Sequence, residues 1–177
     1  IQADGKILVS GFSGFAGSPT GTGIIRFNAD GTTDSTFIPG IVDDFGYVVT
    51  LQADGKILLG GFFRQFGGQE RRNVVRLNPD GTADNFTCAI SSEATVNTIV
   101  RQPDGKLLIG GRFRQVNGVA RRNIARLNAY GTLDLCFDPG SSVGGFNAPF
   151  VYAIAVQPDD RILVSGVFTS FDGSPRN

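Results

Sequence analysis

The stretch LQADGKILLGG at residues 51–61 is repeated, with small changes, elsewhere in the chain. Its copies stand at residues 1–11, 101–111 and 156–166. A second stretch, VRLNPDGTAD at residues 75–84, has copies at residues 25–34 and 125–134. The two stretches keep the same order and recur about every 50 residues. Such regular recurrence identifies an internal repeat.

One repeat reads as four short strands joined by tight turns. Asp54-Gly55 and Asp80-Gly81 each stand between short apolar runs, a setting in which Asp-Gly predicts a β-hairpin. The four strands are predicted at residues 48–51, 56–60, 73–78 and 82–86. No segment shows an apolar period of about 3.6 residues, so we expect almost no helix.

Four antiparallel strands in each repeat predict an all-β fold, a β-propeller-like array of four-stranded antiparallel blades. The 177 residues hold about 3.5 such repeats. We expect the repeats at 1–50, 51–100, 101–155 (with a loop insertion near 140–149) and 156–177, all within one propeller domain. Propellers usually close with about 4–8 blades. We therefore expect further blades from the rest of a longer array, or from another copy of the chain.

The signature Q-x-D-G-K-I-L-x-G-G-F, followed by R-x-N-x-x-R-L-N-x-D-G-T-x-D, resembles the delta-60 repeat. That family of tandem repeats occurs in large exported bacterial proteins and is expected to form β-propellers. The resemblance extends over essentially the whole chain. It departs from the signature at Tyr130, at Asp160 and at residues 21–23. The resemblance implies a propeller fold and an extracellular or cell-surface location, and it implies little about activity.

The charge of the chain is balanced overall but unevenly distributed. The 16 basic residues equal the 16 acidic ones, whereas residues 60–126 hold ten arginines and one lysine against five acidic residues. The arginines of the loop after the second predicted strand are Arg64, Arg71, Arg72, Arg112, Arg114, Arg121 and Arg122. They are either solvated rim charges or a patch that binds an anionic glycan, another anionic polymer or a protein partner.

Two classes of partner are not expected. The aromatic residues are mostly phenylalanine, which suits a core better than a stacking platform, and the net charge is zero, so no nucleic acid is predicted. No apolar run is long enough to span a bilayer, so no membrane insertion is predicted.

Arginine and aspartate recur eight residues apart, on either side of a predicted hairpin turn. The pairs are Arg26 with Asp34, Arg76 with Asp84, and Arg126 with Asp134. A hairpin would bring each pair together on adjacent strands, which favours a structural ion pair over an anion site. Removing one partner of a buried pair costs about 3–5 kcal/mol.

Catalytic and metal chemistry finds little support in the sequence. The chain has no histidine, and its carboxylates stand mainly in predicted turns. The stretch from Asn28 to Asp34 resembles half of a calcium loop but offers too few oxygens, so we interpret it as a hairpin turn. Cys88 and Cys136 are either two buried thiols or a bridge between neighbouring blades. We expect no catalytic residue, no metal and no cofactor.

The leading prediction is therefore a non-enzymatic β-propeller repeat module of an exported or cell-surface protein, which serves as a binding or structural scaffold. One alternative is an enzyme, a glycan hydrolase or lyase, with an active site on the axial face and some catalytic residues outside this chain. A second alternative is a fibre or filament subunit whose open sheet edges pair between copies.

Overall fold

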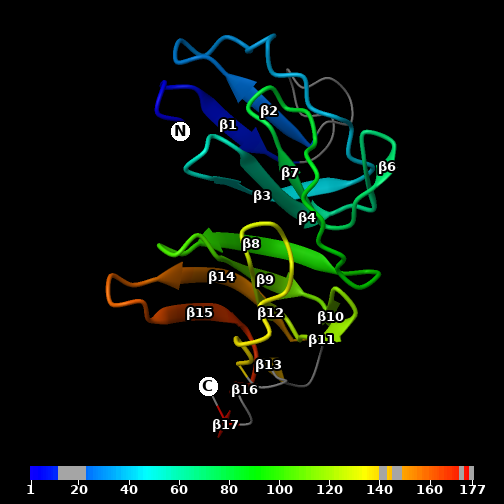
Figure 1. Ribbon diagram of the computed structural model, residues 1–177, viewed down its shortest axis with the longest axis vertical. Helices are drawn as coiled ribbons and strands as arrows, with labels where there is room; N and C mark the ends of the chain where they lie inside the picture. Colours follow the sequence, from blue (N-terminus) through cyan, green and yellow to red (C-terminus); the bar gives the residue numbers. More distant parts are fainter. Residues whose placement is uncertain (12–22, 140–142, 145–148, 172–173, 176–177) are drawn as a thin grey trace. The chain divides into compact units, whose positions relative to one another are not determined.

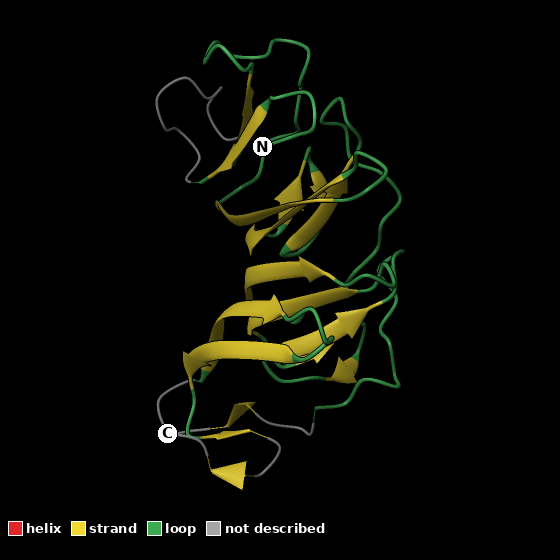
Figure 2. Cartoon of the chain, turned by 90° about the vertical axis from the view of Figure 1, so that its left-hand side faces the viewer, coloured by secondary structure: helices red, strands yellow, loops and turns green. Residues whose placement is uncertain are grey.

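The computed structural model describes residues 1–11, 23–139, 143–144, 149–171 and 174–175. The chain forms two compact units, Ile1–Phe86 and Thr87–Asn177, which are described separately below. Every regular element in the described residues is a β-strand, as Figure 2 shows, and the strands pair in antiparallel order. The predicted all-β class is thus confirmed. None of the described residues form a helix with the length and apolar character needed to cross a bilayer.

In the first unit, the second main sheet has the order β3-β4-β7, and these strands lie side by side in Figure 1. Its strands are β3 (Phe45–Leu51), β4 (Ile57–Phe62) and β7 (Val74–Leu77). Each main sheet begins with the strand before the first stretch, so in the folded chain the second repeat includes residues from Asp43 on, the third from Ser91 on and the fourth from Val143 on. The first repeat supplies a two-stranded sheet of β1 (Ile7–Ser10) and β2 (Ile24–Phe27). A short rim hairpin of β5 (Gln65–Phe66) and β6 (Gln69–Glu70) connects β4 to β7.

The second unit repeats this plan. The sheet of the third repeat has the order β12-β9-β8, from β8 (Thr95–Arg101), β9 (Leu107–Arg112) and β12 (Ile124–Leu127). Its rim hairpin is formed by β10 (Gln115–Val116) and β11 (Val119–Ala120). The fourth repeat contributes β14 (Phe150–Val156) and β15 (Ile162–Val167), and a small sheet of β13 (Val143–Gly144), β16 (Ser170–Phe171) and β17 (Ser174–Pro175). The loop insertion predicted near 140–149 falls mostly outside the described residues.

The predicted Asp-Gly hairpins form, and the turn between β3 and β4 is closed by backbone and side-chain hydrogen bonds. The Gly55 N–H donates to the Gln52 carbonyl oxygen at 3.1 Å, and Asp54 accepts a hydrogen bond from the Lys56 N–H at 3.1 Å. Only the glycine is left-handed, with φ 80°. In the fourth repeat Asp160 takes this position with φ 63°, a conformation that aspartate tolerates better than most residues.

Each main sheet contains a β-bulge opposite the Gly-Gly or Ser-Gly pair of the repeat. The pairing of β3 with β4 shifts between Gly46 and Val48, and β8 and β14 show the same shift. A Cβ on Gly61 would overlap the carbonyl oxygen of Phe45. Glycine is therefore required there by the close approach of two backbones, which is a common reason for glycine inside a strand.

The fourth predicted strand of each repeat is much shorter than expected. In the second repeat, residues 82–86 contact β7 through a single bridge between Leu77 and Ala83. After that bridge the Asp84 carboxylate accepts a hydrogen bond from the Phe86 N–H at 2.7 Å, which turns the chain away from the sheet. The sheets in the described residues therefore have at most three strands, and the rim hairpins were not predicted.

The apolar core lies between the sheets of successive repeats within each unit. In the second unit, Leu108 and Ile124 of the third repeat pack with Val151 and Ile154 of the fourth. In the first unit, the corresponding cluster joins residues of the first repeat, such as Ile24, to β4 and β7. Burial between neighbouring repeats is what stabilises repeat proteins.

Candidate functional site

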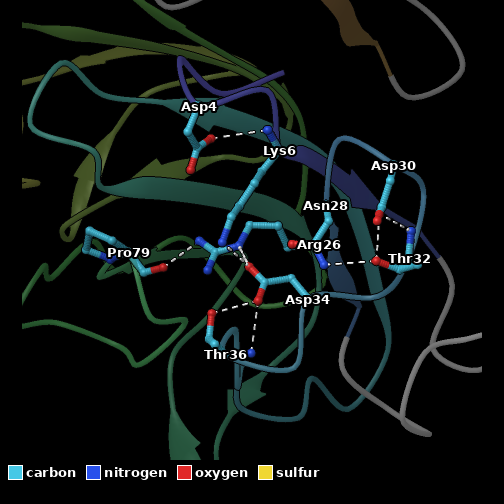
Figure 3. A network of polar contacts seen from close by, with 9 residues as sticks. All are labelled: Asp4, Lys6, Arg26, Asn28, Asp30, Thr32, Asp34, Thr36 and Pro79. Carbon is cyan, nitrogen blue, oxygen red and sulfur yellow. Dashed lines mark hydrogen bonds and ion pairs between the residues drawn. The ribbon is translucent and has the colours of Figure 1, made fainter.

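The last aspartate of the second stretch, Asp34 in the first repeat, is the centre of a polar network (Figure 3). Asp34 Oδ2 accepts hydrogen bonds from Arg26 Nε and Lys6 Nζ, both at 2.7 Å. Asp34 Oδ1 accepts from the Thr36 N–H at 3.0 Å and the Thr36 hydroxyl at 2.6 Å. Arg26 also donates to the carbonyl oxygen of Pro79, in the second repeat, at 2.6 Å. We call the aspartate with its arginine and lysine the aspartate network of the repeat.

The aspartate network recurs in the next two repeats. The distances to aspartate Oδ2 are Arg76–Asp84 2.8 Å, Lys56–Asp84 2.6 Å, Arg126–Asp134 2.8 Å and Lys106–Asp134 2.9 Å. The guanidinium groups lie over phenylalanine rings, with Cζ-to-centroid distances of 4.6 Å at Phe37, 5.0 Å at Phe86 and 4.7 Å at Phe137. The structure thus brings each predicted arginine and aspartate together, and it adds a lysine and a phenylalanine that the sequence analysis did not assign.

These contacts keep the network aspartates ionised. The hydrogen bond from Lys106, followed by the one from Arg126, lowers the pKa of Asp134 to about 2 against the opposing effect of burial. The pKa of Asp34 is also well below its ordinary value, through hydrogen bonds from Lys6 and Thr36. Burial raises the pKa of Asp84, but the hydrogen bonds from Lys56, Phe86 and Arg76 outweigh it and lower the pKa. A carboxylate held this way is a poor general acid, and its arginine is already engaged.

The predicted arginine patch divides between the two units. In the first unit Arg64 is exposed, Arg71 donates to the Phe86 carbonyl oxygen at 3.2 Å, and Arg72 Nε lies 2.8 Å from Glu70 Oε1. The Asp43 carboxylate accepts hydrogen bonds from the N–H groups of Arg64 at 2.8 Å and Gln65 at 3.0 Å. In the second repeat, Arg72 is thus paired with a carboxylate, Arg71 with a backbone carbonyl, and the backbone of Arg64 with the Asp43 carboxylate.

In the second unit, Arg112, Arg114 and Arg122 line a cleft of about 500 Å³. The rest of its lining is Ser91, Ser92, Glu93, Ala94, Phe113, Gln115, Asn123 and Pro149. None of the three arginines forms an ion pair with any described residue. Arg121 is separate from them, because its side chain is buried and lies 3.3 Å from the Asp138 carboxylate.

The backbone around this cleft is held in shape by Asn123. Asn123 has φ 66°, and its side-chain oxygen accepts a hydrogen bond from the Phe113 N–H at 3.0 Å. The Asn123 N–H donates in return to the Phe113 carbonyl oxygen at 3.1 Å. Glu93, on the opposite connection, also has a left-handed φ of 59°. Asn73, the counterpart of Asn123 in the second repeat, has φ 63° and donates to the Phe63 carbonyl oxygen at 3.0 Å, so this backbone arrangement is a feature of the repeat.

The other residues singled out in the sequence are the calcium-like loop and the two cysteines. Asp30 accepts hydrogen bonds from the N–H and hydroxyl of Thr32, at 2.9 and 2.6 Å, so its loop is a hydrogen-bonded turn. The described residues contain no group of three or more side chains placed to hold a metal ion. Cys88 and Cys136 are both free thiols. Cys88 is buried, which raises its pKa to about 12, whereas Cys136 is exposed, so the expectation of two buried thiols is wrong for Cys136.

Comparison with known proteins identifies the repeat. No curated protein matches the chain. A family model matches four segments, residues 2–37, 52–86, 102–137 and 157–177, which together make up more than half of the chain. The first three segments end at the phenylalanine on which the network arginine stacks, which is Phe37, Phe86 or Phe137. The chain therefore belongs to the β-propeller repeat family described as a domain of unknown function, DUF5122.

Proposed function

We propose that this chain is a non-enzymatic binding and scaffold module that holds an anionic partner in the arginine-lined cleft of the second unit. The observation that carries the proposal is the set of three arginines, Arg112, Arg114 and Arg122, which line one cleft without forming an ion pair with any described residue. Neighbouring like charges repel one another, and a bound anion relieves that repulsion. Arginine also presents a planar fork of donors that matches carboxylate, sulfate or phosphate groups.

The acidic groups near the cleft favour a binding function over a catalytic one. Its lining contains one carboxylate, Glu93, and no histidine or second carboxylate that could complete an acid–base pair. The aspartates of the networks are occupied by lysine and arginine donors. If the unmodified chain turned over an acidic glycan and the Glu93→Gln variant did not, the non-enzymatic part of the proposal would be contradicted.

The scaffold part of the proposal rests on the outer face of the fourth repeat. Leu108 of β9 is fully buried against β14, whereas Leu163, at the same position of β15, is 55% exposed. An apolar sheet face of this kind suits a further repeat, from the same protein or from another copy. The resemblance of the repeat signature to the delta-60 repeat supports an exported bacterial protein, with the module outside the cell or at its surface.

The anion-binding proposal is tested on immobilised heparin, a general polyanion. We expect the double variant Arg112→Ala/Arg122→Ala to elute at lower salt than the unmodified chain. The matched control Arg64→Ala removes an exposed arginine of the first unit and should elute close to the unmodified chain. Equal elution of the double variant and the unmodified chain would refute a binding role for the cleft.

A further inference from the structure

The second and third repeats differ in charge at the same structural position. In the second repeat, Asp43 accepts hydrogen bonds from two successive backbone N–H groups, those of Arg64 at 2.8 Å and Gln65 at 3.0 Å. In the third repeat that place belongs to Ser91, whose hydroxyl oxygen accepts from the Arg114 N–H at 3.1 Å. A carboxylate in one repeat is thus replaced by a neutral hydroxyl in the next.

A second carboxylate is lost at the rim hairpin. Arg72 Nε lies 2.8 Å from Glu70 Oε1 in the second repeat. The equivalent of Arg72 is Arg122, and the equivalent of Glu70 is Ala120, which offers no acceptor side chain. Arg122 therefore lines the cleft without the partner that its counterpart has.

The end of the second main strand also becomes more positive from the second repeat to the third. Phe62 closes β4 in the second repeat, and Arg112 closes β9 in the third. The third repeat has thus lost the carboxylates of Asp43 and Glu70 and gained an arginine, at positions around one cleft. Glu93 is the single carboxylate that the cleft lining retains.

We propose that the cleft of the third repeat binds the carboxylate of a uronic acid in an acidic glycan, where the second repeat carries carboxylates of its own. This inference rests on the proposed function and narrows it from anions in general to one chemical class. The second repeat shows that the backbone at this position accepts a carboxylate, because Asp43 occupies it. In the third repeat Ser91 takes the Arg114 N–H, so the arginine side chains are the donors left for a ligand carboxylate, and arginine forms strong charge-assisted hydrogen bonds with carboxylates.

The neutral lining of the cleft favours a sugar over an acidic peptide. Ser91, Ser92 and Gln115 provide side-chain groups that suit the hydroxyls of a sugar ring. The apolar lining residues Ala94 and Phe113 are only 1% and 2% exposed, and Pro149 is half-buried, so the lining presents little apolar surface to a ligand. Peptide interfaces usually rely on exposed apolar or aromatic anchors, which this lining lacks in its described residues.

The test is calorimetric titration of the chain with trigalacturonate, with a neutral galactose trisaccharide and tetra-aspartate as comparison ligands. We expect trigalacturonate to bind and both comparison ligands to bind at least tenfold more weakly. Ser91→Asp restores the carboxylate of the second repeat inside the cleft, and it should weaken trigalacturonate binding on the order of tenfold, equal to about 1.4 kcal/mol. The matched control Arg64→Ala should leave trigalacturonate binding unchanged.

A second variant protects the test against misfolding. Arg112→Phe introduces the residue of the second repeat at an exposed strand end, and it should weaken trigalacturonate binding as Ser91→Asp does. Unchanged binding in a folded Ser91→Asp or Arg112→Phe variant would overturn the inference, as would equal binding of the neutral trisaccharide. If tetra-aspartate bound more tightly than trigalacturonate, the inference would be wrong and an acidic peptide would be the ligand indicated. Retention on heparin that depends on the cleft, without trigalacturonate binding, would refute this inference and leave the proposed function standing.

Discussion

Removing Arg126 should destabilise the fold by about 2 kcal/mol, because it takes one donor from a shared buried acceptor. Arg126→Ala removes the 2.8 Å hydrogen bond from Nε to Asp134 and the contact with the Phe137 ring at 4.7 Å. A hydrogen bond to a charged group contributes about 1.5–3 kcal/mol, and a partly exposed cation–π contact about 0.5–1 kcal/mol. The Arg126 side chain is 19% exposed and Asp134 keeps its lysine, so the lower part of the combined range applies.

The other members of the same network give a predicted order of effects. Asp134→Ala should cost more, about 3–5 kcal/mol, since it leaves Lys106 and Arg126 close together without their shared carboxylate. Lys106→Ala should cost about 1 kcal/mol or less, because the Lys106 side chain is 33% exposed. Arg64→Ala, at an exposed rim position, should change stability by no more than about 0.5 kcal/mol.

The assay is urea unfolding at pH 7 and at one fixed chain concentration, monitored by circular dichroism. The midpoint and slope of each transition give the free energy of unfolding for the four variants and the unmodified chain. If Arg126→Ala and Arg64→Ala had equal unfolding free energies, the stabilising role of the aspartate network would be refuted. An effect of Lys106→Ala as large as that of Asp134→Ala would show that the carboxylate is not the shared centre.

Three further outcomes are expected. Because the pKa of Asp134 is lowered in the folded chain, the stability that its carboxylate contributes is complete above the ordinary pKa of 3.8 and is lost as the pH falls through about 2. The free energy of unfolding should therefore fall between these pH values, and it should fall less in the Asp134→Asn variant. Leu163→Lys should lower the average mass measured by light scattering, and an unchanged mass would contradict association through the β15 face. Asp160→Gly should raise the melting temperature, because relief of a left-handed strain of about 1–2 kcal/mol exceeds the entropic cost of about 0.5–1 kcal/mol that glycine adds; a lower melting temperature would contradict this reasoning.

The repeat, the all-β class and the main strand order could be predicted from the sequence because they depend on local signals. Short apolar runs separated by Asp-Gly determine where the chain turns, and β3, β4 and β7 follow that pattern. The early end of the fourth strand could not be predicted from the same signals. Its residues follow an Asp-Gly turn as those of β4 do, but the Asp84 carboxylate accepts a hydrogen bond from the Phe86 N–H, and the chain turns away after one bridge.

The aspartate network was predicted only in part, for a reason of distance along the chain. Arginine and aspartate are eight residues apart across one turn, so a hairpin is enough to pair them. Lys106 is 28 residues from Asp134 and reaches it through the register of β9 with β12. The recurrence of lysine after the Asp-Gly turn of the first stretch, in three of the four repeats, was the signal that could have identified it.

The cleft shows a different limit of sequence analysis. Sequence analysis identified seven arginines in the loops after the second predicted strand, but the separation of Arg121 from Arg122 depends on the alternation of side chains along an extended segment and on Asp138. The carboxylate of Asp43 could not be assigned to Arg64 and Gln65, because it stands 21 and 22 residues earlier and contacts their backbone. The replacement of the Asp43 carboxylate by the Ser91 hydroxyl depends on the equivalence of these two positions, which follows from their bonds to the N–H groups of Arg64 and Arg114.

The short sequence range of the aspartate network has a consequence for how the chain folds. Lys6 and Arg26 lie 28 and eight residues from Asp34, so all members of the first network are present once a single repeat has left the ribosome. Contacts that are local in sequence form faster than distant ones, since closing a short loop costs less entropy. The hydrogen bond from Arg26 to the Pro79 carbonyl oxygen spans 53 residues and must wait for the second repeat. Folding during synthesis would then advance one repeat at a time, with Arg26 joining the first repeat to the second as soon as the latter emerges.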